Sequence, residues 1–171
     1  DKLDMLIWLL ADSMGPALTT YTAQNMGAGR WDRVCEGNRI GAAMSVAAVA
    51  AVSLGLYFLT GPLGGLFVPV TDAPAVVPLA VAFMRRMAPF FFFYALAESF
   101  SGACCGTGDT VRPMILTLLS ICLLRVLGIL LLLPKQHTME CIIDIYIASW
   151  IAAGIGFLAL WQWEKKRVQR M

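Results

Sequence analysis

Five long apolar runs divide this chain, and each is at least as long as a helix that crosses a bilayer. Such a helix takes about 20 mainly apolar residues. The runs are much longer than strands and lack the alternation of a half-buried sheet, so we predict helices. They lie near residues 3–23, 40–60, 76–105, 114–133 and 142–163.

The composition of the 171-residue chain excludes a soluble domain. Hydrophobic residues make up 59% of it and charged residues 14%, and the mean hydropathy is +0.74. A soluble domain of this size cannot bury so much apolar surface in one core. The predicted fold class is therefore an all-α integral membrane protein with about five transmembrane helices.

The first run does not have the basic start of a signal peptide, because acidic residues take that place. The chain also starts without Met, and we expect it to be an excerpt of a longer protein. Its five cysteines have no metal-ligand spacing, so we expect those in the runs to pack as small apolar residues.

Lys and Arg residues gather on one side of the predicted membrane. Eight lie in the segments after the first, third and fifth runs, whereas the other side has only Lys2 and Lys135. The positive-inside rule then places the first residue outside and the C-terminus in the cytoplasm. The eight are Arg30, Arg33, Arg39, Arg112, Lys165, Lys166, Arg167 and Arg170.

The segment from Glu98 to Arg125 predicts a helical hairpin. A polar hinge at residues 106–110 joins two apolar arms, and Pro113 stands in the first turn of the second arm, where a helix tolerates proline. Each arm carries one ionisable residue, Glu98 or Arg125, which costs about 2.5–3.5 kcal/mol at the bilayer centre. These two residues therefore need a partner or a water-filled cavity.

The third run is too long for one straight perpendicular span. Pro78 and Pro89 predict an interfacial approach helix that bends into the membrane at Pro89, with Arg85 and Arg86 at the outer headgroups. Between residues 61 and 74 we expect an outer loop, because this stretch is rich in proline and has no basic residue.

Small and polar residues follow one face of the first run at spacings of three and four. This stripe has two interpretations: close packing of helices through small residues, or a solvated transport surface. It consists of Asp12, Gly15, Thr19 and Thr22. The second run has a similar stripe at Gly37, Gly41 and Ser45, which favours tight helix contact.

Three ionisable residues form the candidate ion or substrate site, together with Tyr94 on the face of Glu98. At about 1.5 Å per residue, Asp12 and Arg125 lie about 18 Å from the cytoplasmic ends of their runs, and Glu98 about 10 Å. We expect Arg125 to neutralise one acid and leave the other to bind H⁺ or Na⁺. A purely structural buried network is the alternative.

Two motifs resemble those of the multidrug and toxic compound extrusion (MATE) transporters. The segment TAQNMGAG at residues 22–29 is similar to their QNxGAG segment, and SGACCGTGDT at residues 101–110 is similar to their SGALRGTGDT hairpin. The matching residues are Gln24, Asn25, Gly27, Ala28, Gly29, Gly102, Gly106, Gly108, Asp109 and Pro113.

This resemblance implies that the chain is part of the C-terminal lobe of a two-lobe transporter with about twelve helices. The N-terminal lobe and one further helix would then be its missing partners. Cys104 and Cys105 stand where the family usually has Leu-Arg, so the role of that arginine is not carried over. The position where some members have a cation-binding acid falls near Tyr94, one turn from Glu98.

The resemblance also implies secondary active efflux of cationic or amphipathic compounds from a cell membrane, without a cofactor and without nucleic acid. Two alternatives remain open. A flippase for lipid-linked oligosaccharides needs a wide basic cavity, although only Arg125 lies deep. A thiol enzyme using Cys104 and Cys105 needs a nearby base, although the only histidine, His137, falls in a predicted outer loop.

Overall fold

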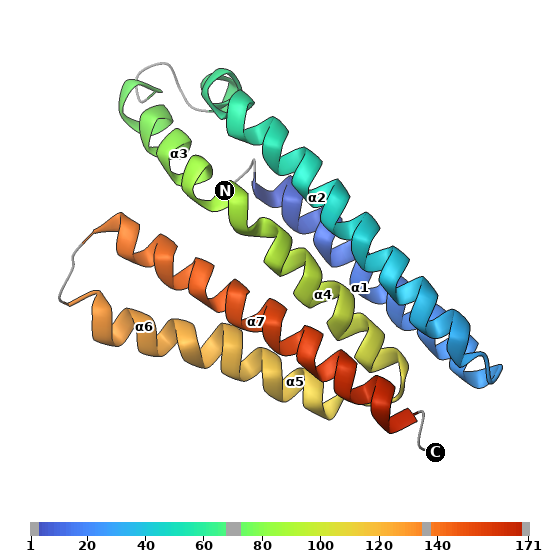
Figure 1. The fold of residues 1–171 in the computed structure, drawn as a ribbon. Coiled ribbons are helices and arrows are strands. Elements are labelled where there is room, and N and C mark those ends of the chain that lie inside the picture. The colour runs from blue at the N-terminus through green and yellow to red at the C-terminus, as the bar shows by residue number, and fades with distance from the viewer. Residues whose placement is uncertain (1–3, 68–72, 135–137, 169–171) are drawn as a thin grey trace.

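The computed structural model describes residues 4–67, 73–134 and 138–168, and within these the regular elements are all helices. Figure 1 shows them as long rods that run roughly along one axis. In chain order they are α1 (Asp4–Gly27), α2 (Trp31–Phe67), α3 (Ala73–Met87), the 3₁₀ turn η1 (Ala88–Phe90), α4 (Phe91–Gly106), α5 (Val111–Thr117), the π-helix η2 (Leu118–Leu123), α6 (Leu124–Leu132) and α7 (Met139–Val168).

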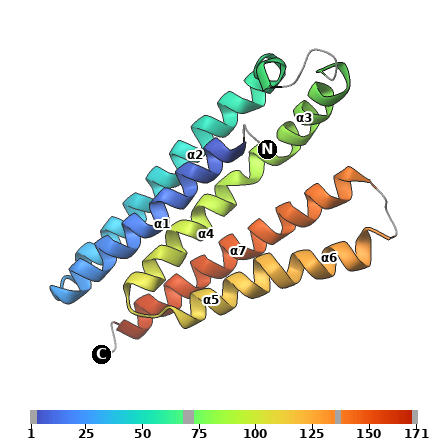
Figure 2. The same cartoon turned by 180° about the vertical axis from the view of Figure 1, so that it is seen from behind.

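Helix α4 lies in the centre of the bundle. It packs most extensively against α1 and then against α7 and α2, whereas α6 makes its main contacts with α7. Figures 1 and 2 show the continuous rod of α5, η2 and α6 at the edge of the bundle, beside α7. The α4 side chains of Tyr94 and Ser99 are therefore buried and that of Glu98 is half-buried, whereas much of the α5–α6 rod has no protein partner within the described residues.

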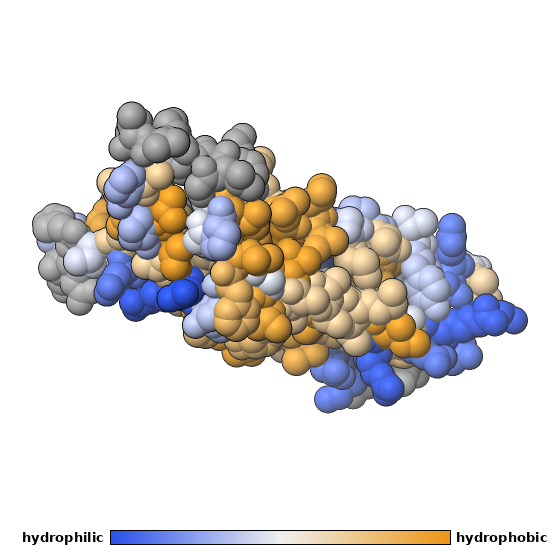
Figure 3. Space-filling model, turned by 90° about the horizontal axis from the view of Figure 1, so that it is seen from above, coloured by the Kyte–Doolittle hydropathy of each residue, from blue (hydrophilic) through white to orange (hydrophobic). Residues whose placement is uncertain are grey.

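The predicted all-helical membrane fold is confirmed. Within the described residues, four helical stretches are long and apolar enough to cross a membrane: 31–64, 73–106, 111–132 and 139–168. Figure 3 shows one face of the molecule, with hydrophobic residues gathered in its middle and hydrophilic residues toward both ends. This distribution is that of a protein embedded in a bilayer.

Helix α1 differs from the other predicted spans. Its 24 residues are enough to span, but it is not among the four stretches that are apolar enough. Its Asp and Thr residues lower its mean hydropathy. The first predicted span is thus a long helix with polar residues on one side, which places it next to protein or water rather than wholly in lipid.

The predicted outer loop at 61–74 begins too early, because α2 continues through Pro62 to Phe67. The helix at 31–67 is also longer than the predicted span at 40–60. Proline inside a membrane helix is tolerated where neighbours compensate for the lost hydrogen bond. Lys2, Lys135 and His137 lie outside the described residues.

The predicted bend at Pro89 is confirmed. Helix α3 ends at Met87, a 3₁₀ turn covers residues 88–90, and α4 continues from Phe91. Before the bend, Arg86 donates two hydrogen bonds to the carboxylate of Asp144, at 3.0 and 2.8 Å. This contact ties α3 to the N-terminal part of α7.

Close packing explains most of the stripe on α1. A Cβ added to Gly102 would lie 2.2 Å from the carbonyl oxygen of Gly15, so the backbones of α1 and α4 nearly touch there. The hydroxyl of Thr19 donates a hydrogen bond to the carbonyl of Gly102 at 3.0 Å. Thr22 packs in the same way against Gly106 of the hairpin motif.

The two glycine-rich motifs end helices. Gly29 has a φ of +69°, the Arg30 N–H bonds to the Asn25 carbonyl at 2.9 Å, and the Gly29 N–H bonds to the Met26 carbonyl at 3.0 Å. This is a Schellman cap, which requires the left-handed conformation that glycine adopts freely. Gly108, with a φ of +93°, turns the chain between α4 and α5.

A π-helix interrupts the fourth predicted span. It covers residues 118–123 and ends two residues before Arg125, although no proline or glycine marks it in the sequence. Such segments are rare and often occur at functional sites. Its position changes the direction in which the following residues of α6 point.

Candidate ion and substrate site

Asp12 and Tyr94 meet at the contact between α1 and α4. The Tyr94 hydroxyl donates a hydrogen bond to Oδ1 of Asp12 at 2.6 Å. Tyr94 is buried, whereas Asp12 stands on the exposed side of α1. The carboxylate is therefore held on one side by protein and is open on the other.

Glu98 lies one helical turn further along α4, and one turn before Gly102, where α1 comes closest. A Cβ added to Gly15 would lie 3.5 Å from the Glu98 carboxylate oxygen Oε2. Gly15 follows Asp12 by three residues, so the two acids occupy neighbouring turns of the same helix contact. The structure thus brings together the predicted residues Asp12, Tyr94 and Glu98.

The side of α1 that carries Asp12 is open, and its exposed polar residues alternate with exposed apolar ones such as Met5, Leu9 and Ala17. Ser13, Thr20 and Gln24 are exposed along it, together with Pro16. The Ser13 and Thr20 hydroxyls donate hydrogen bonds to carbonyls of their own helix, at 2.8 and 3.0 Å. We call this the α1 polar face, comprising Asp12, Ser13, Pro16, Thr20 and Gln24.

Arg125 does not join this group. Within residues 4–67, 73–134 and 138–168 it forms no ion pair, and the expected ion pair with Asp12 or Glu98 is absent there. Its Nε donates a hydrogen bond to the Ser149 hydroxyl at 2.9 Å, and its guanidinium lies 4.1 Å from the centre of the Tyr146 ring. Its Nη2 is buried and has no partner among the described residues.

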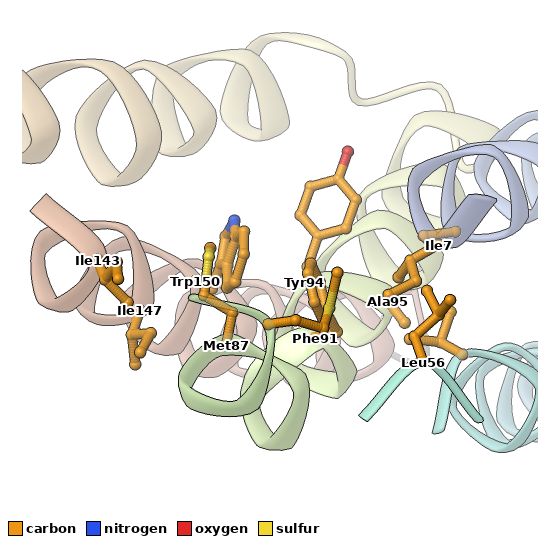
Figure 4. Close-up of a cluster of buried hydrophobic side chains, with 12 residues drawn as sticks. Ile7, Leu56, Met87, Phe91, Tyr94, Ala95, Ile143, Ile147 and Trp150 are labelled. Atoms are coloured by element: carbon orange, nitrogen blue, oxygen red, sulfur yellow. The ribbon is translucent and has the colours of Figure 1, made fainter. Parts of the chain in front are cut away.

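An aromatic cluster separates the acids from Arg125. The Tyr94 and Trp150 rings lie 6.1 Å apart, and Trp150 meets Tyr146 at 6.4 Å, beneath the arginine. In Figure 4 the Tyr94 hydroxyl points away from the labelled apolar side chains of the cluster. The cluster thus lies between the acidic residue Asp12 at one end and the basic residue Arg125 at the other.

The hairpin motif has a charged cluster of its own. The Arg112 guanidinium contacts both Asp109 and Glu164, and Arg167 contacts Glu164 at 3.3 Å. Burial alone raises the pKa of Asp109, but the Arg112 N–H, Glu164 and the Arg112 guanidinium together lower that pKa below its usual value. This charge cluster, comprising Asp109, Arg112, Glu164 and Arg167, links the motif to the end of α7.

The cysteines of the hairpin lie largely inside the protein. Cys104 is buried and Cys105 half-buried, and all five cysteines are free thiols. The described residues contain no group of acids, cysteines or histidines arranged to hold a metal ion. Cys104 packs in an apolar cluster that includes Phe100, Ala103 and Phe157.

Three partners were not identified from the sequence. Ser149 accepts a hydrogen bond from Arg125, and the Tyr146 ring lies under the Arg125 guanidinium. Glu164 accepts a hydrogen bond from Arg112. Of the three, Glu164 was the easiest to predict, because it is an acid directly before a basic tail. The contacts of Arg125 depend on the π-helix before it, and no residue type indicated that element.

The fold and these polar groups define a multi-pass helical membrane protein with ionisable residues held between its helices. The family model named MatE matches residues 2–131. The chain belongs to the MatE family.

Comparison with curated proteins gives a similar result. The chain is 28% identical over 120 residues to the probable multidrug resistance protein NorM of Thermotoga maritima. The match covers 70% of this chain and 25% of that relative, so the chain matches about a quarter of the relative's length. No solved structure matches the chain significantly.

Proposed function

We propose that this chain is part of a secondary active transporter that expels cationic or amphipathic compounds in exchange for H⁺ or Na⁺. The α1 polar face is the observation that carries the proposal. A helix inside a membrane protein does not expose a carboxylate such as that of Asp12 to lipid, because an ionisable group there would lack water or a polar partner on its open side. This face therefore borders a water-filled cavity or another part of the protein.

Family membership supports the same proposal, and so does the name of the relative, a probable multidrug resistance protein. A cleft between two lobes requires chain beyond these helices. We infer that the described bundle belongs to a C-terminal lobe, and that α1 faces the N-terminal lobe across the cleft. Two-lobe transporters alternate access to a site near the bilayer midplane.

The coupling ion is proposed to bind at Asp12 and Glu98. Asp12 has one oxygen fixed by Tyr94 and stands on the open side of α1, and Glu98 lies in the next turn. A cation held there is close to the rings of Trp8 and Tyr94, whose centres lie 4.6 Å apart. Carboxylates beside aromatic faces suit cations, because both attract positive charge.

We propose that the positive charge of Arg125 repels small cations at the end of the aromatic cluster opposite Asp12. Arg125 forms no ion pair with an acid among the described residues, so its charge is not neutralised there. A lone arginine also argues against a lipid-linked oligosaccharide as substrate, since a diphosphate group requires several basic residues. We place the protein in the cell membrane with the C-terminus in the cytoplasm, on the strength of its Lys and Arg distribution.

The test uses the protein as its own gene encodes it, reconstituted into liposomes that contain a fluorescent organic cation. An imposed pH or Na⁺ gradient should drive efflux, and Asp12→Asn and Glu98→Gln should each reduce the gradient-driven rate at least tenfold. Glu140→Gln is the matched control, because that acid lies exposed at the outer end of α7. Unchanged gradient-driven efflux in both Asp12→Asn and Glu98→Gln would end the proposal.

A further inference from the structure

Two cavities meet at Arg112, beside the end of α7. The first is polar, has a volume of about 320 Å³ and is lined by Thr107, Asp109, Arg112 and Arg167 among others. The second is an apolar groove of about 400 Å³ between the α5–η2 segment and α7, lined by Ile115, Leu119, Ala159 and Trp163 among others. Arg112 lines both, so the two cavities are adjacent.

The two arginines keep most of their hydrogen-bond donors free. Every hydrogen bond and ion pair of their side chains within the described residues uses only Nη1. The Nε and Nη2 groups of both residues remain available, three N–H donors on each guanidinium. Planar forks of this kind bind phosphate oxygens in pairs.

The acids of the charge cluster lie beneath the arginines. The side chains of Arg112 and Arg167 are 45% and 46% exposed, whereas those of Asp109 and Glu164 are 12% and 1% exposed. The carboxylates therefore fix the Nη1 edges from inside, and the outer surface presents guanidinium groups. Lys165 and Lys166 add positive charge at the same end of α7.

Trp163 stands at the boundary between the two cavities. Its ring lies 4.2 Å from the Arg112 guanidinium and 5.7 Å from that of Arg167. Trp is favoured at the level of lipid headgroups, where one part of its ring is apolar and another is wet. The polar pocket thus lies at headgroup level, and the groove extends from it toward the hydrocarbon.

We propose that this junction binds an anionic phospholipid, with its phosphate on Arg112 and Arg167 and an acyl chain in the groove beside Trp163. The Nε and Nη2 donors of the two arginines, which the acids leave free, bind the phosphate oxygens. The groove selects a molecule that also has a long apolar chain, since it runs about 10 Å along the helices from Arg112 to Leu119. A free anion would use the pocket alone.

Quenching of Trp163 fluorescence by brominated acyl chains tests this site. The protein as its own gene encodes it is placed in nanodiscs of phosphatidylcholine that contain a fixed fraction of brominated phosphatidylglycerol or brominated phosphatidylcholine. The signal of Trp163 is the difference between the protein and its Trp163→Phe variant. Phosphatidylglycerol should quench this signal at least threefold more strongly than phosphatidylcholine.

Three variants locate the preference. Arg112→Gln with Arg167→Gln should remove it by removing the phosphate ligands. Ala159→Phe should remove the preference by filling the groove. Because this variant leaves the charge cluster intact, it tests the site even where the double variant fails to fold. Arg30→Gln with Arg33→Gln is the matched control, since it removes two charges from the α1–α2 turn and should keep the preference.

Four results would overturn the proposal. The first is equal quenching by the two lipids, and the second is a preference that survives Ala159→Phe. The third is a preference that excess inorganic phosphate abolishes, because the pocket would then bind a free anion without the groove. The fourth is no quenching of Trp163 by either lipid, because the groove would then be covered by protein.

Discussion

The Tyr94 hydroxyl and the Asp12 carboxylate are joined by a hydrogen bond of 2.6 Å, which connects the central helix α4 to the polar side of α1. Tyr94 is buried and Asp12 is exposed, so the bond holds an open carboxylate in a fixed direction. Glu98 stands in the next turn of α4, beside Gly15. The proposed ion site depends on this arrangement of one fixed and one neighbouring acid.

Tyr94→Phe should weaken gradient-driven efflux without unfolding the protein. A hydrogen bond to a charged group contributes about 1.5–3 kcal/mol, and the remaining ring keeps its contacts with Trp8 and Trp150. Efflux assays across a series of ion gradients should show weaker apparent ion affinity, by tenfold or more. Tyr57→Phe on α2 is the control, and equal ion affinity in both variants would contradict the assigned role.

Gly102→Ala should destabilise the bundle. The new Cβ would lie 2.2 Å from the Gly15 carbonyl oxygen, which is backbone and cannot move aside, so α1 and α4 must separate. Overpacking of this kind costs about 1–3 kcal/mol. Thermal unfolding in detergent measures it, and Gly55→Ala, which meets no atom within 4 Å, should leave the melting temperature equal or higher.

Arg125→Leu should leave a stable protein with impaired transport. The guanidinium has one buried Nη2 without a partner among the described residues, and an arginine at the bilayer centre costs about 2.5–3.5 kcal/mol. Removing it should raise or preserve the melting temperature, while the selectivity of efflux for organic over small cations falls. A large loss of stability with normal selectivity would show that Arg125 is purely structural.

Asp109 should make the stability of the charge cluster dependent on pH. Its pKa in the folded protein lies below the ordinary value, so its contribution is fully present above the unfolded pKa of about 4 and is lost as the pH falls through the folded pKa. Asp109→Asn should therefore lower the melting temperature at pH 7. The difference from the unmodified protein should shrink toward pH 3, and a constant difference would contradict the sign of the shift.

The sequence predicted the parts of the fold that depend on hydrophobicity and on proline and glycine. The membrane class, the bend at Pro89 and the turn at Gly108 follow from residue types that leave few alternatives. Pro62 was a misleading signal. It sits within α2, because proline in a membrane helix can be compensated by its neighbours.

The candidate site was predicted only in part. Asp12, Tyr94 and Glu98 were expected on the faces where they lie, because helical spacing fixes a face. The position of Arg125 was not predictable, since an ion pair depends on side-chain direction between helices and on the unpredicted π-helix before it. The spacing along one helix gives the height of a residue in the membrane, but it does not identify the partner of that residue on another helix.

The most direct test concerns whether the α1 polar face meets water. In a cysteine-free variant that retains efflux, Thr20→Cys and Leu123→Cys are each treated with a membrane-impermeant thiol reagent. Both positions are exposed in the structure, but Thr20 belongs to the α1 polar face and Leu123 to the apolar surface of the α5–α6 rod. We predict that the cysteine at position 20 reacts and is protected by a transported cation, while the one at position 123 does not react. Equal reactivity at both positions, or none at position 20, would contradict it.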